Sequence, residues 1–421
     1  MTAAKGADPA TGLGTLILRI YLPFAAAYFL SYLYRTVNAV IGPVIARELQ
    51  LGAADLGLLT SIYFMTFAAI QLPLGVALDR FGPRRVQGVL MFFAAGGAAL
   101  FGLGDSMLSL TIGRALIGLG VAAGLMAALK AITLWFPPGR WPLLNGLHMA
   151  AGGLGSLVAT QPAQAALSIM TWHGVFFWLS GITVVSAIAL LVVVPEKPGS
   201  QAKGSLADQI KAVGRIYRDP FFWRLTPMFV VQQCAFIGIQ TLWIGPWLRD
   251  VAGQDETTRA TTMLLTAAAM TIGFLTSGMV VGALLKRGVS AYTTATVGLT
   301  LFIAAHAVVT FVPGVPALPA WLAFGFLGTY VIVYFPVLTA AFPVELSGRV
   351  TTCVNFVMFG SIFVAQWGIG RILDLWPRTP SGGYAPEGYV WAFGLFVALQ
   401  LVALAWMTVF RPKPLTERMT G

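Results

Sequence analysis

The chain has 421 residues, of which 57% are hydrophobic and only 10% are charged. This composition, with its repeated apolar runs of about 20 residues, excludes a soluble globular domain and indicates that lipid surrounds most of the chain. The formal net charge of +11 does not indicate a nucleic-acid partner, because the basic residues follow membrane topology.

Hydrophobic windows predict an all-α membrane protein with twelve transmembrane helices. The expected spans are 17–42, 55–78, 84–104, 107–136, 143–168, 173–194, 222–248, 259–285, 289–312, 318–342, 350–374 and 389–410. A polar segment at 195–221 is the expected cytoplasmic linker between a six-helix bundle over 1–194 and a second over 222–421. The first span is too long for a signal-peptide core, so we expect it to remain.

Basic residues outside the spans predict the orientation. With the N-terminus in the cytoplasm, cytoplasmic segments carry 18 of the 26 Lys and Arg residues and the other side carries 5. The five on the other side are Arg47, Arg249, Arg259, Arg371 and Arg378. The positive-inside rule therefore predicts a multi-pass protein of the cell inner (plasma) membrane with both termini in the cytoplasm.

The first span carries a polar stripe on one helical face. Its members are Tyr28, Ser31, Tyr32, Arg35 and Asn38, spaced at i, i+3, i+4, i+7 and i+10. Such a stripe must face water or protein. Arg35 lies about 10 Å from the outer end, at 1.5 Å per residue. We expect Arg35 to bind an anion, with snorkelling to the outer interface as the alternative.

The segment between the second and third spans is a candidate gate at the cytoplasmic side. It contains Gly75, Asp79, Arg80, Gly82, Arg84 and Arg85. Gly75 would let helices approach closely, and Asp79 would accept from a neighbouring helix N-terminus and pair with an arginine. The alternative is that these arginines only set the orientation of the chain in the membrane.

The fourth span places two further cations in the membrane. Arg114 lies at a depth similar to that of Arg35, and no acidic residue lies within either helix interior. Two unneutralised guanidiniums predict an anion clamp, with helix packing by Arg114 as the alternative. Lys130 lies on another face, toward the cytoplasm. We expect either a snorkelling or interhelical role for it or a role in an inner vestibule.

The second half repeats landmarks of the first half in the same order. Asp79-Arg80 corresponds to Lys286-Arg287, Phe136-Pro137 to Phe342-Pro343, and Ile41-Gly42-Pro43 to Ile244-Gly245-Pro246. Duplicated six-helix halves around a central cavity are typical of secondary transporters. Because the corresponding loop of the second half lacks the aspartate, we expect that half to hold the cytoplasmic gate closed less tightly than the first half does.

Neutral polar side chains are expected to complete the site from the second half. They are Gln233, Gln240, Trp243, Tyr330 and Tyr334. Hydrogen bonding and stacking would be their contribution, although aromatic residues at helical spacing more often pack. Asn145 and Asn355 occupy equivalent places in the repeat, and we expect them to bond across helices.

These motifs resemble a known family. Gly75-x-x-x-Asp79-Arg80-x-Gly82-x-Arg84-Arg85 resembles the loop signature of the major facilitator superfamily, and Arg114-x-x-x-Gly118-x-Gly120 is similar to its second signature. The resemblance implies a major facilitator fold of two six-helix bundles that rock about a midplane site.

A narrower resemblance concerns the cargo. Tyr34-Arg35-Thr36-Val37-Asn38 resembles the first-helix motif of the anion:cation symporter family, in which arginines of helices 1 and 4 bind the anionic group. This implies substrate binding by Arg35 and Arg114. Tyr34 replaces the family's aspartate, and Val121 stands where such symporters often carry a proton-coupling glutamate.

The sequence leaves the coupling open. No acidic residue lies at an expected midplane, and His148, near the inner end of the fifth span, is the candidate for coupling, although a lone histidine is more often structural. Anion exchange, uniport driven by the membrane potential, and a proton carried by the substrate are the options. Cys234 and Cys353 fall in apolar spans and are expected to be packed thiols.

The combined expectation is a secondary active transporter for a small organic anion, a carboxylate above all. It would be a symporter or antiporter working by alternating access, a monomer in membrane lipid, without cofactor, metal or nucleic acid. The alternative is a multidrug or amphiphile exporter; a nitrate carrier and copper uptake through methionines are weaker. No motif of a membrane enzyme is found.

Overall fold

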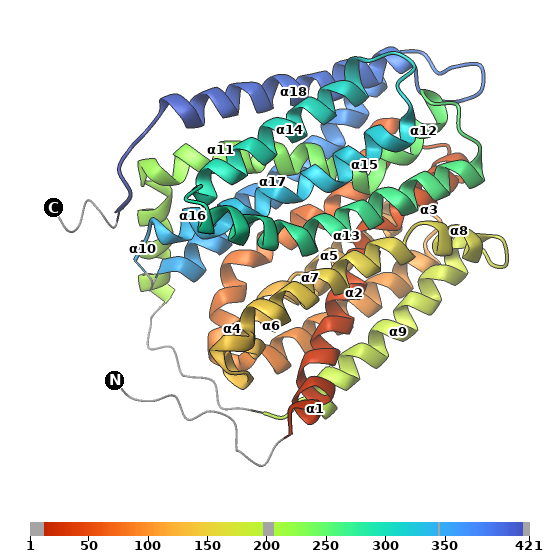
Figure 1. The fold of residues 1–421 in the computed structure, drawn as a ribbon. Helices are drawn as coiled ribbons and strands as arrows, with labels where there is room; N and C mark the ends of the chain where they lie inside the picture. Colours follow the sequence, from red (N-terminus) through yellow and green to blue (C-terminus); the bar gives the residue numbers. More distant parts are fainter. Residues whose placement is uncertain (1–11, 197–205, 344–345, 416–421) are drawn as a thin grey trace, which may run out of the picture.

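The computed structural model describes residues 12–196, 206–343 and 346–415. Two groups of helices stand side by side, drawn in red to yellow and in green to blue (Figure 1). Part of the expected linker, residues 197–205, lies outside the described residues, and the rest contains a helix, α10 (Leu206–Tyr217). No strand occurs in the described ranges.

The first group is formed by residues before the linker. Its helices are α1 (Leu13–Leu16), the π-helix η1 (Ile17–Tyr21), α2 (Leu22–Thr36), α3 (Asn38–Glu48), α4 (Ala53–Leu103), α5 (Met107–Val121), α6 (Gly124–Trp135), the 3₁₀-helix η2 (Pro138–Arg140), α7 (Trp141–Val158), α8 (Gln161–Leu167) and α9 (Trp172–Val193).

The second group follows α10. Its helices are α11 (Pro220–Gly238), the π-helix η3 (Ile239–Trp243), α12 (Ile244–Asp250), α13 (Glu256–Lys286), α14 (Ala291–Phe311), α15 (Ala317–Leu327), the 3₁₀-helix η4 (Gly328–Val333), α16 (Tyr334–Ala340), α17 (Ser347–Leu373) and α18 (Pro386–Val409).

Each of the twelve expected spans falls on these helices. Ten helical stretches of the described chain are long and apolar enough to cross a membrane. One of them, α4, has 51 residues, about 75 Å at 1.5 Å per residue, which is more than twice the thickness of a bilayer core. It turns at Gly82, whose φ of 79° suits glycine, so α4 covers two expected spans. The expected span 143–168 falls on α7 and α8.

Four helices that face the interior are interrupted near their middle. The interruptions lie between α2 and α3, between α5 and α6, at η3 and at η4. An interrupted helix leaves carbonyl groups without intrahelical partners, and in lipid each must be satisfied by protein. Non-helical turns at membrane depth are typical of transporter binding sites.

Buried glutamines on neighbouring helices bond to these freed carbonyls. Gln71 Nε2 donates to the carbonyl of Ala122, at 3.3 Å. Gln232 Nε2 donates to the carbonyl of Gly328 at 2.9 Å. Gln366 Nε2 donates to the carbonyl of Gly238 at 3.2 Å. The interruptions are therefore built into the packing of the two groups.

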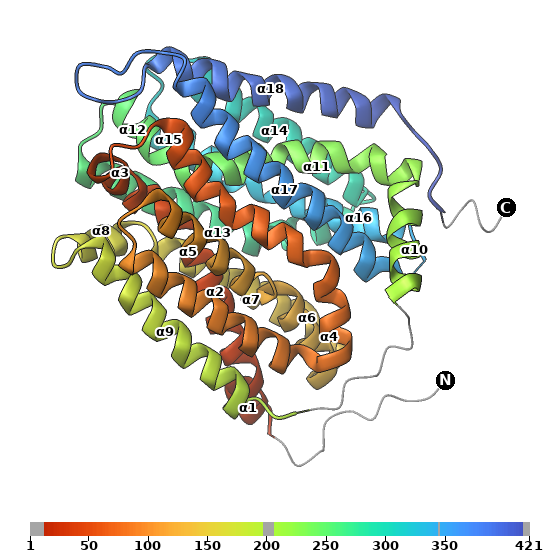
Figure 2. The ribbon, with the colours of Figure 1, turned by 180° about the vertical axis from the view of Figure 1, so that it is seen from behind.

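The two groups are joined at the end of the molecule that carries α3, α8 and α12 (Figure 2). There the backbone N–H groups of Ala53 and Ala54, at the start of α4, donate to the carboxylate of Asp374, at 3.0 and 2.7 Å. Gln164 Nε2 donates to Glu256 Oε1 at 2.5 Å. We call this end the Asp374 end.

Helices of the two groups also approach closely near the Asp374 end. A Cβ atom on Gly57 would lie 2.8 Å from the carbonyl oxygen of Gln366, so only glycine permits this contact between α4 and α17. Phe64 and Phe359 stack farther along the same pair of helices, with ring centroids 6.1 Å apart. The Asp374 end is thus closed by backbone contact as well as by hydrogen bonds.

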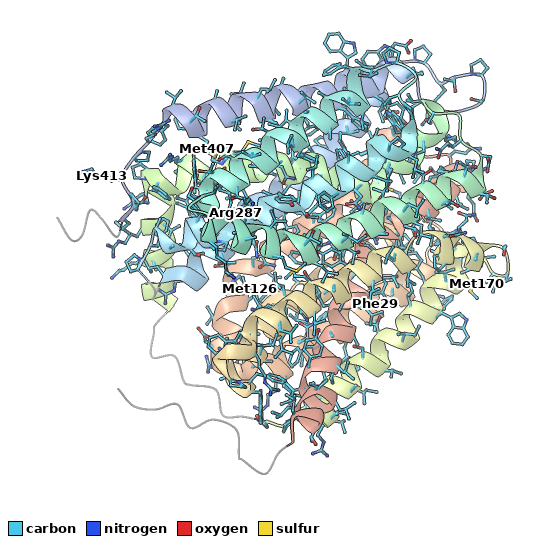
Figure 3. All side chains as sticks on the ribbon, in the orientation of Figure 1. Phe29, Met126, Met170, Arg287, Met407 and Lys413 are labelled. Carbon is cyan, nitrogen blue, oxygen red and sulfur yellow. The ribbon has the colours of Figure 1, made fainter. Side chains whose placement is uncertain are left out.

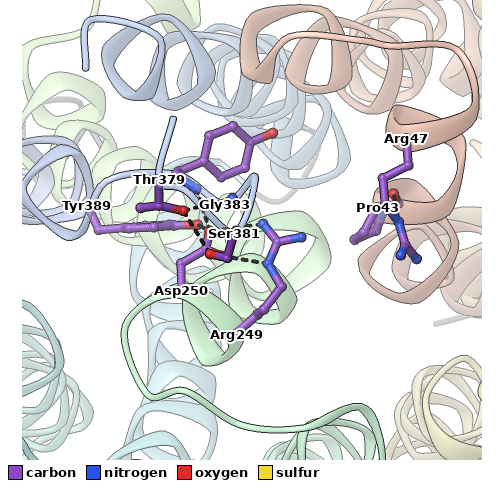
Figure 4. Close-up of polar contacts among 9 residues, drawn as sticks. Pro43, Arg47, Arg249, Asp250, Thr379, Ser381, Gly383 and Tyr389 are labelled. Atoms are coloured by element: carbon purple, nitrogen blue, oxygen red, sulfur yellow. Dashed lines mark hydrogen bonds and ion pairs between the residues drawn. The ribbon is translucent and has the colours of Figure 1, made fainter. Parts of the chain in front are cut away.

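A second carboxylate fixes the loop between α17 and α18 at this end. Asp250 accepts from Arg249 Nε at 2.5 Å, from the hydroxyl of Tyr389 at 2.8 Å and from a loop amide (Figure 4). Thr379 closes the loop by accepting from the N–H of Gly383 at 2.9 Å. These contacts all lie within the second group.

Candidate functional site

A cavity of about 600 Å³ lies between the two groups of helices. Its walls come from the interrupted helices and from α4, α7, α13 and α17. Deep in the cavity lie Arg35, Thr36, Ser156, Gln240 and Thr241. At the opposite end, away from the Asp374 end, the lining reaches Asn145, Thr339 and Thr351. The cavity therefore extends from the middle of the molecule toward the end with α10.

Arg35 is the charged residue of this cavity. Its side chain is 5% exposed, and no carboxylate lies within ion-pair distance of it among the described residues. Its Nε has no hydrogen-bond partner. A buried guanidinium without a counter-ion is costly and can be stabilised by an anionic ligand.

Aromatic rings from both groups surround this guanidinium. Its Cζ lies 4.5 Å from the ring centroid of Tyr32, 5.5 Å from that of Phe67 and 5.4 Å from that of Phe359. Cation–π contacts of this kind hold the charge in place without neutralising it. A guanidinium held in this way has the planar donor geometry that matches a carboxylate or a phosphate.

Several expected polar residues line the same cavity. Tyr28 and Tyr32 lie on the first helix, with hydroxyl groups 3.5 Å apart. Gln233 and Gln240 face them from α11 and η3, and the Oε1 atom of Gln233 is buried without a partner. The cavity therefore combines one cation with neutral donors and acceptors from the opposite wall.

Arg114 does not share the cavity, although the sequence suggested a clamp of two arginines. Its side chain is fully buried, and its NH1 donates to the carbonyl of Tyr34 at 2.9 Å. The guanidinium lies over the rings of Tyr63 and Phe101, at 5.4 and 6.0 Å. Similar depth therefore did not imply a common face: Arg114 packs behind the first helix.

Asn38 also differs from the expected stripe. The break at Val37 ends α2, and Asn38 begins α3, where its Nδ2 donates to Thr60 Oγ1 at 3.2 Å. It lies outside the cavity lining, unlike the other four members of the stripe. A straight helix was assumed, and the break removes Asn38 from the common face.

Three aromatic residues of the second group pack between helices instead of lining the cavity. Trp243 donates from Nε1 to the carbonyl of Gln366, at 3.3 Å. The hydroxyl of Tyr334 bonds to Thr296 Oγ1 at 2.8 Å, and the Tyr330 side chain lies against Gly298 of α14. Helices η3 and η4 explain the difference, because π and 3₁₀ turns change the rotation per residue that the spacing assumed.

Lys130 pairs with the gate motif and lies outside the cavity lining. Its Nζ forms an ion pair with Asp79 and donates to the carbonyl of Leu78 at 2.9 Å. The sequence suggested an arginine or a helix N-terminus as the partner of Asp79. The observed pair joins α4 to α6 within one group, so it does not itself latch the two groups together.

The arginines of the motif contact the end of α9 and the chain that follows it. Arg84 donates to the carbonyl of Leu191, and Arg85 lies 2.5 Å from Glu196. Arg80 stacks on Phe81, with 5.3 Å between Cζ and the ring centroid. These contacts stabilise the first group of helices.

The glycines of the motif differ in what they do. Gly82 provides the left-handed turn within α4, whereas a Cβ atom on Gly75 would meet no atom within 4 Å. The close approach expected at Gly75 occurs in the second signature, since Cβ atoms on Gly118 and Gly120 would meet backbone atoms of α4 at 2.2 Å. Replacing either of these two glycines must separate the helices.

His148 lies behind the cavity wall. Its ring stacks on Tyr28, with centroids 4.3 Å apart, and neither ring nitrogen has a hydrogen-bond partner. The residue is fully buried and is not part of the lining. Its contact with the cargo would therefore run through Tyr28.

Sequence reasoning missed part of the lining. Asn145 and Asn355 face the cavity, although bonds across helices were expected of them. Four methionines also line it, namely Met126, Met149, Met270 and Met358. Figure 3 shows Met126 between the two groups of helices. The repeat-equivalent places of the two asparagines were the signal that could have found them. Cys234 and Cys353 are free and buried.

The family model described as Major Facilitator Superfamily matches residues 24–366. The chain belongs to the major facilitator superfamily. It is a multi-pass membrane protein of that superfamily, with apolar helices around a central cavity. The interrupted helices and the cavity between two helix groups are what a transporter of this fold requires.

Two relatives of this major facilitator protein are named for organic anions. It is 23% identical to the probable sulfoacetate transporter SauU of Cupriavidus necator, over 62% of this chain and 64% of that protein. It is 31% identical to the probable L-galactonate transporter of Escherichia coli, over 40% of this chain and 37% of that protein. The chain thus spans between 37% and 64% of the lengths of these relatives.

A solved structure shows the same fold. It is that of a bacterial homologue of the human lysosomal transporter Spinster, described as inward-facing and unoccupied. The match has a TM-score of 0.72 at 19% identity and covers 94% of this chain and 97% of that chain.

Proposed function

We propose that this transporter moves a small organic anion, with a carboxylate as the favoured headgroup, across the inner membrane by alternating access. Arg35 binds the anionic group. The observation that carries the proposal is a buried guanidinium, without a carboxylate partner, deep in a cavity between the two helix groups. Both relatives named above are described as transporters of organic anions, which supports the same class.

The neutral polar groups around Arg35 complete the proposed site. Gln240 is 7% exposed and shares the deep part of the cavity with Thr241. An anion whose charge meets Arg35 can accept a further hydrogen bond from the side-chain amide of Gln240, which belongs to the opposite group. Such an anion is held by both groups at once, and binding is thereby linked to their relative position.

Orientation follows from the charges at the two ends. Arg80, Arg84, Arg140 and Arg287 lie at the end opposite the Asp374 end, and the positive-inside rule makes that end cytoplasmic. In Figure 3, Arg287 and Met170 mark these opposite ends. The proposed conformation is therefore open to the cytoplasm and closed outside, with both termini in the cytoplasm.

The lining also bears on how transport is driven. The described lining contains no Asp, Glu or His, so a proton relay through a carboxylate of the cavity has no residue to use. Exchange of one anion for another, or movement of the anion driven by the membrane potential, needs no such residue. We favour these two modes over proton symport through the site.

The second candidate function is export of an amphiphile. It is favoured by the methionines and phenylalanines of the cavity wall. The two functions differ in their dependence on Arg35, because a neutral or cationic amphiphile gains nothing from a guanidinium.

The test is a thermal-shift screen of the purified protein against carboxylates, sulfonates, phosphates, amino acids and cationic drugs, followed by uptake into proteoliposomes. An anion that binds the folded state raises the apparent melting temperature by mass action. Arg35→Ala should abolish that shift and the uptake while leaving folded protein in the membrane. If Arg35→Ala binds and transports the anion normally, the proposal is wrong.

A further inference from the structure

The cavity wall between a deep polar level and a polar level near the opening is mostly apolar, although Tyr28, Tyr32, Gln233 and Asn355 also line it. The deep level holds Arg35, Thr36 and Ser156, where the two hydroxyl groups bond to each other at 3.1 Å. The level near the cytoplasmic opening holds Asn145 and Thr351. Between these levels along the helices lie methionines and phenylalanines of both groups, which we call the apolar zone. Its members are Met126, Met149, Met270, Met358, Phe236 and Phe335.

The charge of the cavity matches a single negative charge. Arg35 is the one charged side chain of the described lining. A second carboxylate on a ligand would lie against the apolar zone or against neutral amides, where an unpaired charge is strongly disfavoured. A monoanion leaves neither partner with an unpaired charge.

The apolar zone fits a hydrophobic ligand body. Its four methionines come from α6, α7, α13 and α17, so they surround the cavity from both groups. Methionine is flexible and polarisable, and it adapts to apolar ligands of differing shape. A polyhydroxylated body of similar length would lose hydrogen bonds to water here, and the few polar side chains of this stretch could replace only some of them.

The size of the cavity agrees with such a ligand. Its volume of about 600 Å³ falls within the range of roughly 300–1,000 Å³ found for sites that enclose drug-sized molecules. A cargo of two or three carbons would fill a small part of this space. The deep position of Arg35 places the headgroup inward and leaves the body along the apolar zone.

From these features we infer that the cargo is an amphipathic monoanion, a monocarboxylate whose apolar body lies along the apolar zone. This inference rests on the proposed function and specifies its substrate class. It distinguishes this transporter from the two relatives named for sulfoacetate and L-galactonate, whose cargoes are small and polar.

The test measures binding to the wild-type protein in lipid nanodiscs by calorimetry. A homologous series of phenylacetate, 4-phenylbutyrate and 6-phenylhexanoate varies the apolar body at constant charge. Suberate adds a second carboxylate, L-galactonate replaces the apolar body with hydroxyl groups, and 4-phenylbutyramide removes the charge. Each probe is repeated on Arg35→Ala.

Affinity should increase along the phenyl series by about fivefold to tenfold for each two added CH₂ groups. This gain is smaller than the free energy of transfer of two CH₂ groups out of water would give, because binding also orders the flexible chain of the ligand. Suberate, L-galactonate and 4-phenylbutyramide should each bind at least tenfold more weakly than 4-phenylbutyrate. Met126→Gln, which keeps the length of the side chain but adds an amide, should flatten the series. Met263→Gln, a buried methionine outside the lining, should not.

The outcomes separate the two proposals. If L-galactonate or suberate binds more tightly than the phenyl series and Arg35→Ala abolishes that binding, the organic-anion function stands and the amphipathic cargo is wrong. If 4-phenylbutyramide binds as tightly as 4-phenylbutyrate and Arg35→Ala changes neither, both proposals fail. A series with equal affinities, or without binding, also overturns the amphipathic cargo.

Discussion

The guanidinium of Arg35 stacks on Phe359 of the opposite helix group, with 5.4 Å between Cζ and the ring centroid. The ring of Phe359 in turn lies 4.2 Å from that of Phe67, centroid to centroid, across the same interface. The proposed anion-binding residue thus takes part in the contact between the two groups. A ligand that draws Arg35 toward its own charge must alter this contact.

Replacing Phe359 by leucine tests this coupling. Phe359→Leu keeps an apolar side chain but removes the ring face, and the loss of a cation–π contact of about 0.5–2 kcal/mol should weaken anion binding several-fold. The dissociation constant of the tightest anion from the thermal-shift screen is the measurement. Phe393→Leu is the control, because Phe393 is a buried ring of the second group that lies outside the cavity lining. Equal effects of both variants would contradict the coupling.

Asp374 offers a test of the closed end. Asp374→Asn keeps the shape of the side chain but removes the negative charge to which the first two N–H groups of α4 donate. A capping carboxylate stabilises such a contact by about 1 kcal/mol. The outward-open population should therefore rise by about fivefold. Double electron–electron resonance between labels at Ser168→Cys and Val251→Cys, with both native cysteines replaced by alanine, measures the separation of the groups at this end.

The control for Asp374 is Asp255→Asn. Asp255 also caps a helix, accepting from the N–H groups of Thr257 and Thr258, but it lies within one group. This variant should leave the distance distribution unchanged. A longer distance in both variants, or in neither, would show that Asp374 does not latch the two groups.

The ion pair of Lys130 and Asp79 should contribute to stability and not to binding. Its side chains are 22% and 49% exposed, so a coupling free energy of about 0.5–1 kcal/mol is expected in place of the value for a buried pair. A double-mutant cycle with Lys130→Met and Asp79→Asn, read by unfolding in denaturant, measures it. Anion affinity should stay within about twofold. A tenfold loss in Lys130→Met would instead assign Lys130 to the path of the anion.

Much of the fold could be predicted from the sequence, because lipid imposes a simple rule on apolar runs. Each expected span falls on helix. The length rule placed a break between residues 78 and 84, where Gly82 turns α4, but it could not anticipate the single positive φ that makes the turn. Nor could it show which end is closed, because hydrogen bonds such as that of Ala53 with Asp374 join distant parts of the chain.

The site was predicted best where helices are regular, although Gln240 within η3 also lines the cavity as expected. Tyr28, Tyr32 and Arg35 share a face of uninterrupted α-helix, and the spacing placed them together in the cavity wall. Beyond the break at Val37, and within η3 and η4, the assumed 100° per residue no longer holds. Asn38 and Tyr330 therefore point elsewhere.

Replacement by lysine should have opposite effects at the two buried arginines, on the melting temperature in one case and on anion affinity in the other. Arg114→Lys removes a planar donor that bonds to the carbonyl of Tyr34, so the first and fourth spans lose a buried hydrogen bond, at a cost of about 1–3 kcal/mol. The apparent melting temperature should decrease while the anion affinity of the folded protein stays within about twofold.

Arg35→Lys keeps a charge in the cavity but loses the fork and the planar stack on Tyr32. Its melting temperature should change little, whereas anion affinity should decrease by at least tenfold, the charge-assisted hydrogen bonds being worth about 1.5–3 kcal/mol. Calorimetric titration and thermal unfolding of both variants distinguish the roles. If Arg114→Lys loses affinity as strongly as Arg35→Lys, the clamp of two arginines that the sequence suggested forms in another conformation of the transporter.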